Sequence, residues 1–158
     1  MAAIPLTAAG VKRLYEELTR LKSVERPAVI EAIAEARAQG DLSENAEYEA
    51  ARERQAFIEG RIKELDGVLS NAQVIDPTVL ETDGRIVFGA TVTLEDQESG
   101  DEVKYQIVGD LEADIRQNLI SISSPVARAL IGKYEGDLIQ VRVPSGEREF
   151  EILSVEYI

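Results

Sequence analysis

The hydrophobic residues in the first half of the chain recur at steps of three and four, which is the spacing of one helix face. From Thr7 to about Ala38 this apolar stripe contains Val11, Leu14, Leu18, Leu21, Val29, Ile30 and Ile33. Thr7 is placed to cap the helix, and Pro27 should kink or restart it, because proline lacks a backbone donor. A second helix is predicted by the heptad-like stripe Ala51, Ile58, Ile62, Leu65 and Leu69.

A chain reversal at Leu42 and Ser43 would bring the two stripes face to face, with Leu21 opposite Leu65. The pattern therefore predicts an antiparallel coiled-coil hairpin. Each helix of roughly thirty residues would be ~45 Å long at ~1.5 Å per residue. Such a hairpin is longer than its own packing requires, although a purely structural coiled coil has the same pattern.

The apolar period falls to two after residues 76–83, which we interpret as a linker containing Pro77. Strands are predicted in RIVFGATVTLED, EVKYQIVGD and the hairpin LIQVRVPSGEREFEILSVEYI. In SPVARALIGK, Ser124 is the expected N-cap of a short helix, Pro125 its first residue and Gly132 its stop. The predicted fold is α+β, with a coiled-coil domain in residues 1–75 and a small, mainly antiparallel sheet domain in residues 84–158.

Composition limits the possible chemistry. The chain has no Cys and no His, so catalysis would rest on carboxylates, hydroxyls, amines or a metal held by oxygen. The net charge of −13 argues against tight autonomous binding to nucleic acid. The charge is uneven: residues 1–75 carry 10 basic and 13 acidic side chains, and residues 76–158 carry 7 and 17. A nearly neutral amino half can approach a polyanion, whereas the acidic carboxy half suits a basic partner surface.

The amino terminus has no signal-peptide pattern, and no apolar run approaches the ~20 residues that cross a membrane. We therefore expect a cytoplasmic protein without membrane contact.

The segment GDLSEN, residues 40–45, lies at the predicted turn between the helices. Helix capping explains it locally: Gly40 would end the first helix, and Asp41 or Ser43 would cap the second. A chemical role is the alternative, because Asp41 and Glu44 are hard oxygen ligands suited to Mg²⁺. Two carboxylates make half a metal site, so a partner protein would supply the rest, and a long hairpin could carry them into a partner's channel.

Basic and aromatic residues flank this segment. Arg37 precedes it by one turn, and Arg52, Arg54 and Arg61 follow on the second helix. Arg54 and Arg61 are expected to pair within their own helix, whereas Arg37 and Arg52 could contact phosphates. Tyr48 is expected to lie near Arg37, either packing the tip or stacking on a base.

The stretch IAEARAQGDLSENAEYEAARERQAFIEGRIKEL, residues 33–65, closely resembles the bacterial GreA transcript cleavage factors. The resemblance continues through YQIVGDLEAD, NLISISSPVARALIGK and EFEILSVEYI, and covers essentially the whole chain. It implies a coiled coil followed by a domain of FKBP-like topology. It also implies a monomer that binds backtracked bacterial RNA polymerase through its secondary channel and stimulates the polymerase's own cleavage of the nascent RNA 3′ end, without independent enzymatic activity.

The resemblance also assigns roles to residues. Asp41 and Glu44 match the family's catalytic tip acids, which would hold Mg²⁺ shared with the polymerase active site, and we expect the free protein to bind none. The basic patch matches Arg37 and Arg52, which would contact the RNA. Support of the tip is assigned to Gly40, Leu42, Ser43, Asn45 and Tyr48. Docking to the polymerase is assigned to residues of the segment 121–132, namely Ser121, Ser123, Ser124, Pro125 and Arg128.

Two other functions stay open. In the first, the hairpin plugs the polymerase channel and inhibits it without cleavage, and the acids only cap the helix. In the second, the carboxy domain is a prolyl isomerase, but aromatic residues make up only 5% of the chain, with no Trp to line a proline pocket.

Overall fold

The computed structural model describes residues 3–40 and 45–158. Contacts within the chain define two compact units. The first spans residues 12–72, and the second combines residues 3–11 with residues 73–158. The N-terminal residues thus belong, by contact, to the unit formed by the C-terminal half. None of the helices within these described ranges is long and apolar enough to cross a membrane.

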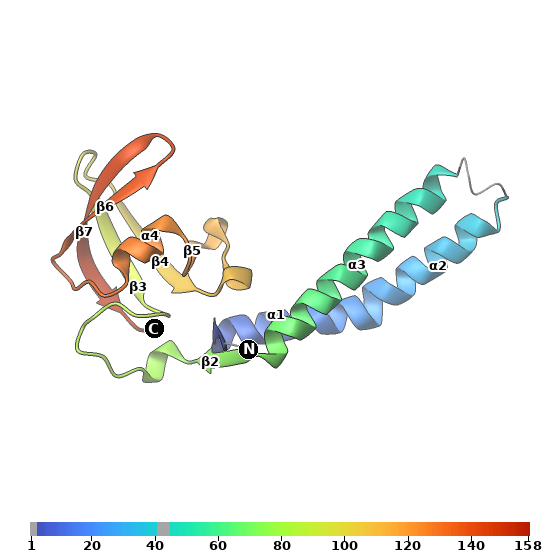
Figure 1. Cartoon of the computed structure of the whole chain (residues 1–158), viewed down its shortest axis with the longest axis horizontal. Helices are drawn as coiled ribbons and strands as arrows, with labels where there is room; N and C mark the ends of the chain where they lie inside the picture. Colours follow the sequence, from blue (N-terminus) through green and yellow to red (C-terminus); the bar gives the residue numbers. More distant parts are fainter. Residues whose placement is uncertain (1–2, 41–44) are drawn as a thin grey trace. The chain divides into compact units, whose positions relative to one another are not determined.

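The helices α1 to α3 form a hairpin, and the first unit contains this hairpin from residue 12 onward (Figure 1). One arm contains α1 (Ala8–Arg20), η1 (Leu21–Glu25) and α2 (Arg26–Arg37), and the other is α3 (Ala46–Ser70). Most of the predicted stripe residues are buried between the arms: Leu14, Leu18, Leu21, Val29, Ile33, Ala51, Ile58, Ile62 and Leu65. Val11 and Leu69 are half-buried, and Ile30 is exposed. It is 53% exposed, because its neighbour Val29 takes the inward position and successive helix residues point in different directions.

The arm containing α1 and α2 changes helix type just before Pro27. η1 is a π-helical turn in which the backbone N–H of Arg26 donates to the carbonyl of Leu21, five residues earlier. Pro27 follows in the first turn of α2, where its missing N–H is tolerated. A kink or a restart of the helix was expected at Pro27. The backbone instead stays helical and changes from a π turn to the α-helix α2, which begins at Arg26.

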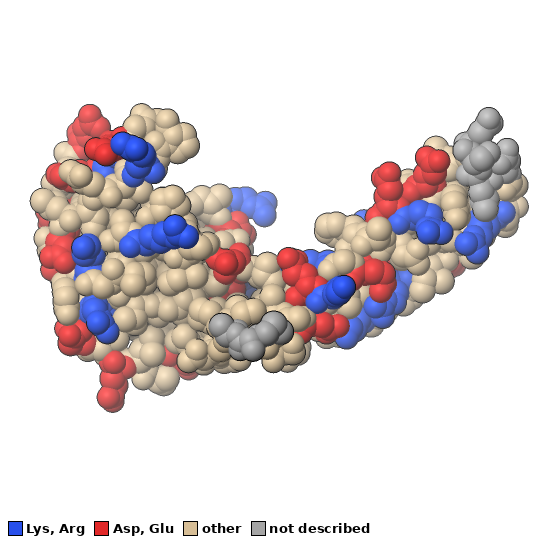
Figure 2. All heavy atoms as spheres, viewed as in Figure 1, with Lys and Arg blue, Asp and Glu red and all other residues tan. Residues whose placement is uncertain are grey.

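Ion pairs connect the two arms in the predicted antiparallel register. Arg26 donates from Nε and Nη2 to the two carboxylate oxygens of Glu59, each at 2.8 Å. Arg61 binds Glu17 in the same two-pronged way, at 2.6 and 3.0 Å, and this hydrogen bonding lowers the pKa of Glu17. Figure 2 shows the resulting mixture of basic and acidic side chains along the hairpin. Such pairs specify alignment more than they add stability, since exposed ion pairs contribute about 0–1 kcal/mol each.

The expectation that Arg54 and Arg61 pair within their own helix is wrong for Arg54 and incomplete for Arg61. Arg54 binds Glu25 on the opposite arm at 2.7 Å. Arg61 does contact Glu64 on its own helix at 2.7 Å, in addition to its bonds across the hairpin. Long arginine side chains reach the facing arm, a partner that periodicity within one helix does not indicate.

The second unit is built on a mixed five-stranded sheet with the order β5-β4-β3-β7-β6. Its strands are β3 (Thr91–Asp96), β4 (Glu102–Val108), β5 (Leu119–Ser121), β6 (Leu138–Val143) and β7 (Gly146–Glu156). Neighbours pair antiparallel except β4 and β5, which run parallel. A separate two-stranded sheet joins β1 (Ile4–Thr7) and β2 (Ala72–Ile75). The predicted α+β class is confirmed.

Helix α4 (Pro125–Leu130) contacts β5 and β6 beside the sheet, and three short 3-10 turns complete the unit (Figure 1). These turns are η3 (Pro77–Val79), η4 (Asp110–Glu112) and η5 (Ile115–Gln117). The caps of α4 are as predicted: Ser124 Oγ accepts from the N–H of Ala127 at 3.3 Å, and Gly132 has φ +85°.

The core of this unit lies between α4 and one face of the sheet. It contains Ile86, Ala90, Val92, Leu94, Ile107, Ile120, Ala127, Leu130, Ile139, Val141, Phe150 and Ile152. The first strand of the sheet, predicted from Arg85, begins only at Thr91. Gly89 has φ +93°, and the N–H of Ala90 bonds back to Val87, so a turn occupies the residues before the strand.

The carboxylate of Glu112 anchors the N-terminal strand within the second unit. Glu112 is 2% exposed and accepts hydrogen bonds from the Thr7 N–H (3.1 Å), the Thr7 hydroxyl and the Gly109 N–H (2.7 Å). A buried carboxylate needs such donors in place of water. Thr7 Oγ1 also accepts from the N–H of Gly10 at 3.0 Å, which confirms the predicted helix cap. A Cβ at Gly10 would overlap with Oε1 of Glu112, so only glycine fits beside this hydrogen-bonded carboxylate.

We predict opposite effects for two Gly→Ala substitutions in helices. Gly10→Ala should lower the free energy of unfolding by about 1–3 kcal/mol, because the new methyl group must displace the hydrogen-bonded Glu112 carboxylate. Gly60→Ala is the matched control: a Cβ there has no neighbour within 4 Å, so it should stabilise α3 by about 0.5–1 kcal/mol. Differential scanning calorimetry measures both. If the Gly10→Ala protein were as stable as the parent, the Glu112 carboxylate could be displaced without lowering the free energy of unfolding.

Candidate functional site

The end of the hairpin is closed by the side chain of Asn45. Its Oδ1 accepts from the N–H of Tyr48 at 3.0 Å and caps α3, while its Nδ2 donates to the carbonyl of Ala36 on α2 at 2.9 Å. The prediction that Asp41 or Ser43 caps this helix is wrong, because α3 begins at Ala46. Gly40, with φ +111°, follows the last turn of the other arm, in agreement with its predicted role as a helix stop.

The two predicted metal ligands, Asp41 and Glu44, lie outside the described residues, as do Leu42 and Ser43. Residues 3–40 and 45–158 contain no group of three or more acidic side chains arranged to hold a metal ion. On donor chemistry, Asp41 and Glu44 suit Mg²⁺, but two carboxylates are fewer ligands than its octahedral shell requires. A metal at the tip would therefore need ligands from outside this chain.

Directly behind the tip, Arg37 and Arg52 both lie against the ring of Tyr48. Each guanidinium carbon is 5.9 Å from the ring centroid, one reaching it from α2 and the other from one turn further along α3. Arg52 Nη1 also donates to the Tyr48 hydroxyl at 3.2 Å. These contacts, first with Arg37 and then with Arg52, lower the pKa of Tyr48. The predicted proximity of Tyr48 and Arg37 is thus confirmed, and Tyr48 links the two arginines.

Arg37 and Arg52 differ from three other arginines of the hairpin in what their charged groups contact. Arg26, Arg54 and Arg61 are in ion pairs across the hairpin. Within the described ranges, by contrast, no carboxylate forms an ion pair with Arg37 or Arg52. Two exposed guanidinium groups, held at one ring and with donors still available, can bind an anion such as phosphate.

A second polar cluster precedes α4 in the other unit. Ser121 and Ser123 both donate to Oδ1 of Asp110, Ser123 at 2.8 Å, and the Ser123 N–H donates to Ser121 Oγ at 3.0 Å. The hydrogen bond from Ser121, followed by that from Ser123, lowers the pKa of Asp110. Ser124 is not part of this cluster because it caps α4.

Asp110 is a residue that the sequence analysis missed. It lies in η4 and organises the serines from a distance of 11 and 13 residues along the chain. Its only signal in the sequence is an acidic residue just after a strand and a glycine. Nothing in that local pattern indicates which hydroxyls it will meet.

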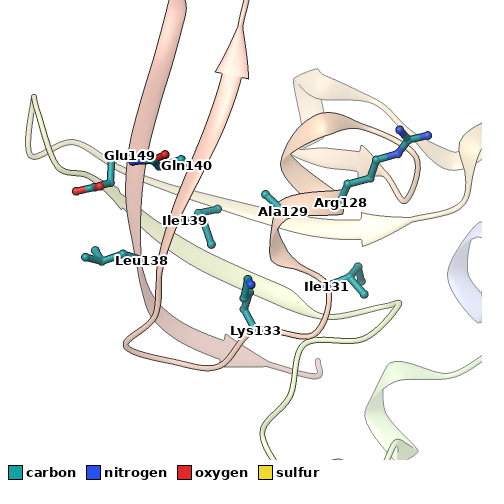
Figure 3. A pocket seen from close by; sticks show the side chains of 8 residues that line it. All are labelled: Arg128, Ala129, Ile131, Lys133, Leu138, Ile139, Gln140 and Glu149. Atoms are coloured by element: carbon teal, nitrogen blue, oxygen red, sulfur yellow. The ribbon is translucent and has the colours of Figure 1, made fainter.

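A shallow groove of about 510 Å³ also runs between α4 and the β6–β7 hairpin (Figure 3). Ile131, Leu138 and Ile139 provide its apolar part, and Lys133 and Glu149 contribute opposite charges. Arg128, predicted to act with the serines, extends away from Leu138 and Ile139 in this view. The groove was not predicted, since its two sides come from separate parts of the sequence.

Known proteins resemble the chain along its whole length. Residues 4–74 match the family model described as transcription elongation factor, N-terminal, and residues 81–157 match the one described as transcription elongation factor, GreA/GreB, C-term. The chain is 64% identical to transcription elongation factor GreA of Alkalilimnicola ehrlichii over 99% of each protein, and 65% identical to that of Ralstonia nicotianae over 100% of each. The crystal structure of GreA factor homolog 1 of Thermus thermophilus is 32% identical over 98% of this chain and 99% of that chain, with a TM-score of 0.43.

The Arg37–Tyr48–Arg52 cluster predicts an early-titrating phenol. Tyr48, whose pKa is lowered, should ionise at lower pH than Tyr134, which donates to Asp83 at 3.1 Å and whose pKa is raised. Ultraviolet titration of tyrosinate measures this order. Tyr48→Phe should remove the transition at the lower of these two pH values, and Tyr134→Phe, the control, the one at the higher value. Gln in place of both arginines should return the Tyr48 transition toward its ordinary pH; an unchanged titration would contradict the cluster.

Proposed function

Because the chain belongs to the GreA/GreB family of transcription elongation factors, we propose that its hairpin enters the secondary channel of a backtracked bacterial RNA polymerase and brings Asp41 and Glu44 to the polymerase active site. The family stimulates transcript cleavage by RNA polymerase, and so does this chain; it does not cut RNA on its own. The observation that carries the proposal is the long hairpin, in which Arg37 and Arg52 lie at Tyr48 near the ends of the two arms. The sequence between the arms contains the two carboxylates, Asp41 and Glu44. We place this action in the cytoplasm and expect a monomer.

The reach of the hairpin supports entry into a channel. The 25 residues of α3 correspond to a helix about 38 Å long at ~1.5 Å per residue. Its buried seam and cross-hairpin ion pairs keep the two arms together, so the end can be presented at a distance without other support. A hairpin of this length is not needed to form an active site within one chain. It is needed if the hairpin end must reach an active site inside a partner protein.

Asp41 and Glu44 would act by completing a metal site of the polymerase. The described residues supply no metal site of their own, and the two carboxylates fit a shared Mg²⁺ ion. When bound, the ion would help form the attacking hydroxide and stabilise charge at the phosphate. The chain's own contribution is to hold the two carboxylates at the end of a rigid hairpin, with Gly40 and Asn45 fixing the helix ends on either side.

Arg37 and Arg52 would bind phosphates of the displaced nascent RNA 3′ end. Their guanidinium groups are held at Tyr48 and are not in ion pairs with any described carboxylate. Phosphate contacts position a nucleic acid without reading its sequence, which suits a factor that must act wherever the polymerase stalls. Tyr48, Gly40 and Asn45 are tip-supporting residues in this proposal, as are Leu42 and Ser43.

Docking on the polymerase surface is the proposed role of Ser121, Ser123, Ser124, Pro125 and Arg128. In support, Asp110 holds two of these serines in place and Ser124 fixes the start of α4, so the surface is ordered before a partner arrives. The strongly acidic carboxy half suits a basic surface on the partner.

Replacing both tip acids separates cleavage from binding. Asp41→Ala with Glu44→Ala should reduce transcript shortening in backtracked complexes about 100-fold or more, because the metal loses its ligands from this chain, while polymerase affinity stays nearly unchanged. The control, Glu31→Ala with Glu35→Ala, removes the same charge from exposed positions of α2 and should cleave normally. Shortening that survives the tip substitutions would refute the catalytic assignment. Binding without any shortening by the parent protein would favour a channel-plugging inhibitor.

Polymerase affinity should depend on Asp110 through the serines. Asp110→Asn should weaken binding about tenfold in a competition assay, since an amide holds the two hydroxyls less strongly than a carboxylate. Ser123→Ala should have little further effect in the Asp110→Asn background, because both changes break one network. Asp101→Asn, an exposed acid in the β3–β4 turn, is the control for the lost charge. Additive losses would indicate that Asp110 contacts the partner by itself.

A further inference from the structure

The hairpin carries a second groove beside the arginine pair, which we call the hairpin groove. It is about 590 Å³ in volume and is lined by Ile30, Ile33, Ala34 and Arg37 from α2 and by Arg52 and Gln55 from α3. All of these residues belong to the first unit. Of these residues, only Arg37 and Arg52 were assigned a role from sequence, and Ile30 was counted with the buried stripe.

One side of the hairpin groove is apolar and open. Ile30 is 53% exposed although it is a large hydrophobic residue, and the exposed Ala34 continues the same face one turn later. Ile33, which also lines the groove, is buried. Flat organic rings bind favourably to such a surface, at about 25 cal/mol per Å² of apolar area removed from water.

The other side of the hairpin groove is cationic. Arg37 and Arg52 border it, and both lie 5.9 Å from the ring of Tyr48. Tyr48 is therefore engaged by the two guanidinium groups and acts as the residue that positions them. Gln55 adds an amide, which can both donate and accept hydrogen bonds. An apolar floor next to paired guanidinium groups and an amide complements a ligand that joins a flat, polar-edged ring to negative charge.

We propose that the hairpin groove binds one nucleotide of single-stranded RNA, with its base on Ile30 and Ala34, its edge near Gln55 and its flanking phosphates on Arg37 and Arg52. This inference rests on the proposed function, which brings nascent RNA to the hairpin end. It extends that function from phosphate contact to recognition of an unpaired base. In this proposal Tyr48 positions the two arginines, and the base packs on Ile30 and Ala34 and not on the Tyr48 ring.

The test compares two ligands on the full chain: a short oligouridylate and an abasic ribose-phosphate oligomer of the same length and charge. Binding is followed by NMR chemical shifts of the isotopically labelled protein at low salt. The oligouridylate should bind about five- to tenfold more tightly than the abasic oligomer and should shift the amides of Ile30 and Ala34. Equal affinity for the two ligands, or no binding of the oligouridylate, would overturn the proposal.

Variants assign the two parts of the hairpin groove. Ile30→Ser should lose the preference for the base-bearing oligomer while binding the abasic one as before. Val24→Ser is the matched control, since Val24 is 54% exposed on the same arm but outside the groove. Arg37→Gln with Arg52→Gln should weaken both ligands and flatten the salt dependence. Because Ile30 is exposed, these proteins should keep their helical circular dichroism. Gln55→Ala is a second variant, at the residue that is placed near the edge of the base.

Two further outcomes are decisive. A short acidic peptide that binds as tightly as the oligouridylate and shifts the same amides would overturn the assignment of RNA as the occupant. Transcript cleavage by the polymerase is measured separately with the parent and Ile30→Ser proteins. Failure of the parent to stimulate cleavage would refute the proposed function, whereas normal cleavage together with equal binding of the two oligomers would refute only the base site.

Discussion

The two hydrogen bonds of the Asn45 side chain are the constraint on which the hairpin end depends. By capping α3 through Tyr48 and donating to Ala36 of α2, this one amide joins the ends of both arms. It thereby fixes the start of α3, which contains Tyr48 and Arg52. It also ties this helix to the last turn of α2, which contains Arg37. Asn45, and not Asp41 or Ser43, is therefore the N-cap of α3.

The arginines of the hairpin divide into two groups by what they contact. Arg26, Arg54 and Arg61 bind carboxylates on the facing arm and hold the seam in register. Arg37 and Arg52 contact an aromatic ring, which positions them without neutralising their charge. A net-acidic chain can in this way present a local cationic surface to phosphate, since the interaction is decided over a few ångströms while distant charges are screened by salt.

In the second unit, the turn η4 contains two acidic residues, Asp110 and Glu112, that have different structural roles. Glu112 points inward and binds the strand that precedes α1, whereas Asp110 points outward and holds Ser121 and Ser123. The buried hydrogen bonds of Glu112 hold η4 in place and thereby help to position Asp110 and the two serines. A surface organised in this way loses little conformational entropy when a partner binds, which is the physical advantage of preorganisation.

The sequence by itself determined the two helical arms, the change from helical to strand periodicity, and the caps of α4, because each follows from spacing or from residues within one turn. It also identified the acids and arginines of the hairpin end, through residue type and a long family resemblance. Only the tertiary structure decided that Asn45 is the cap, since several neighbouring polar residues satisfy the same local pattern. It likewise decided that Ile30 is exposed beside a groove, that Asp110 holds the serines and that Glu112 meets Thr7 at 105 residues' separation. The physical reason is that a hydrogen bond or a groove depends on which backbone segments are brought together in space, and neither periodicity nor composition contains that information.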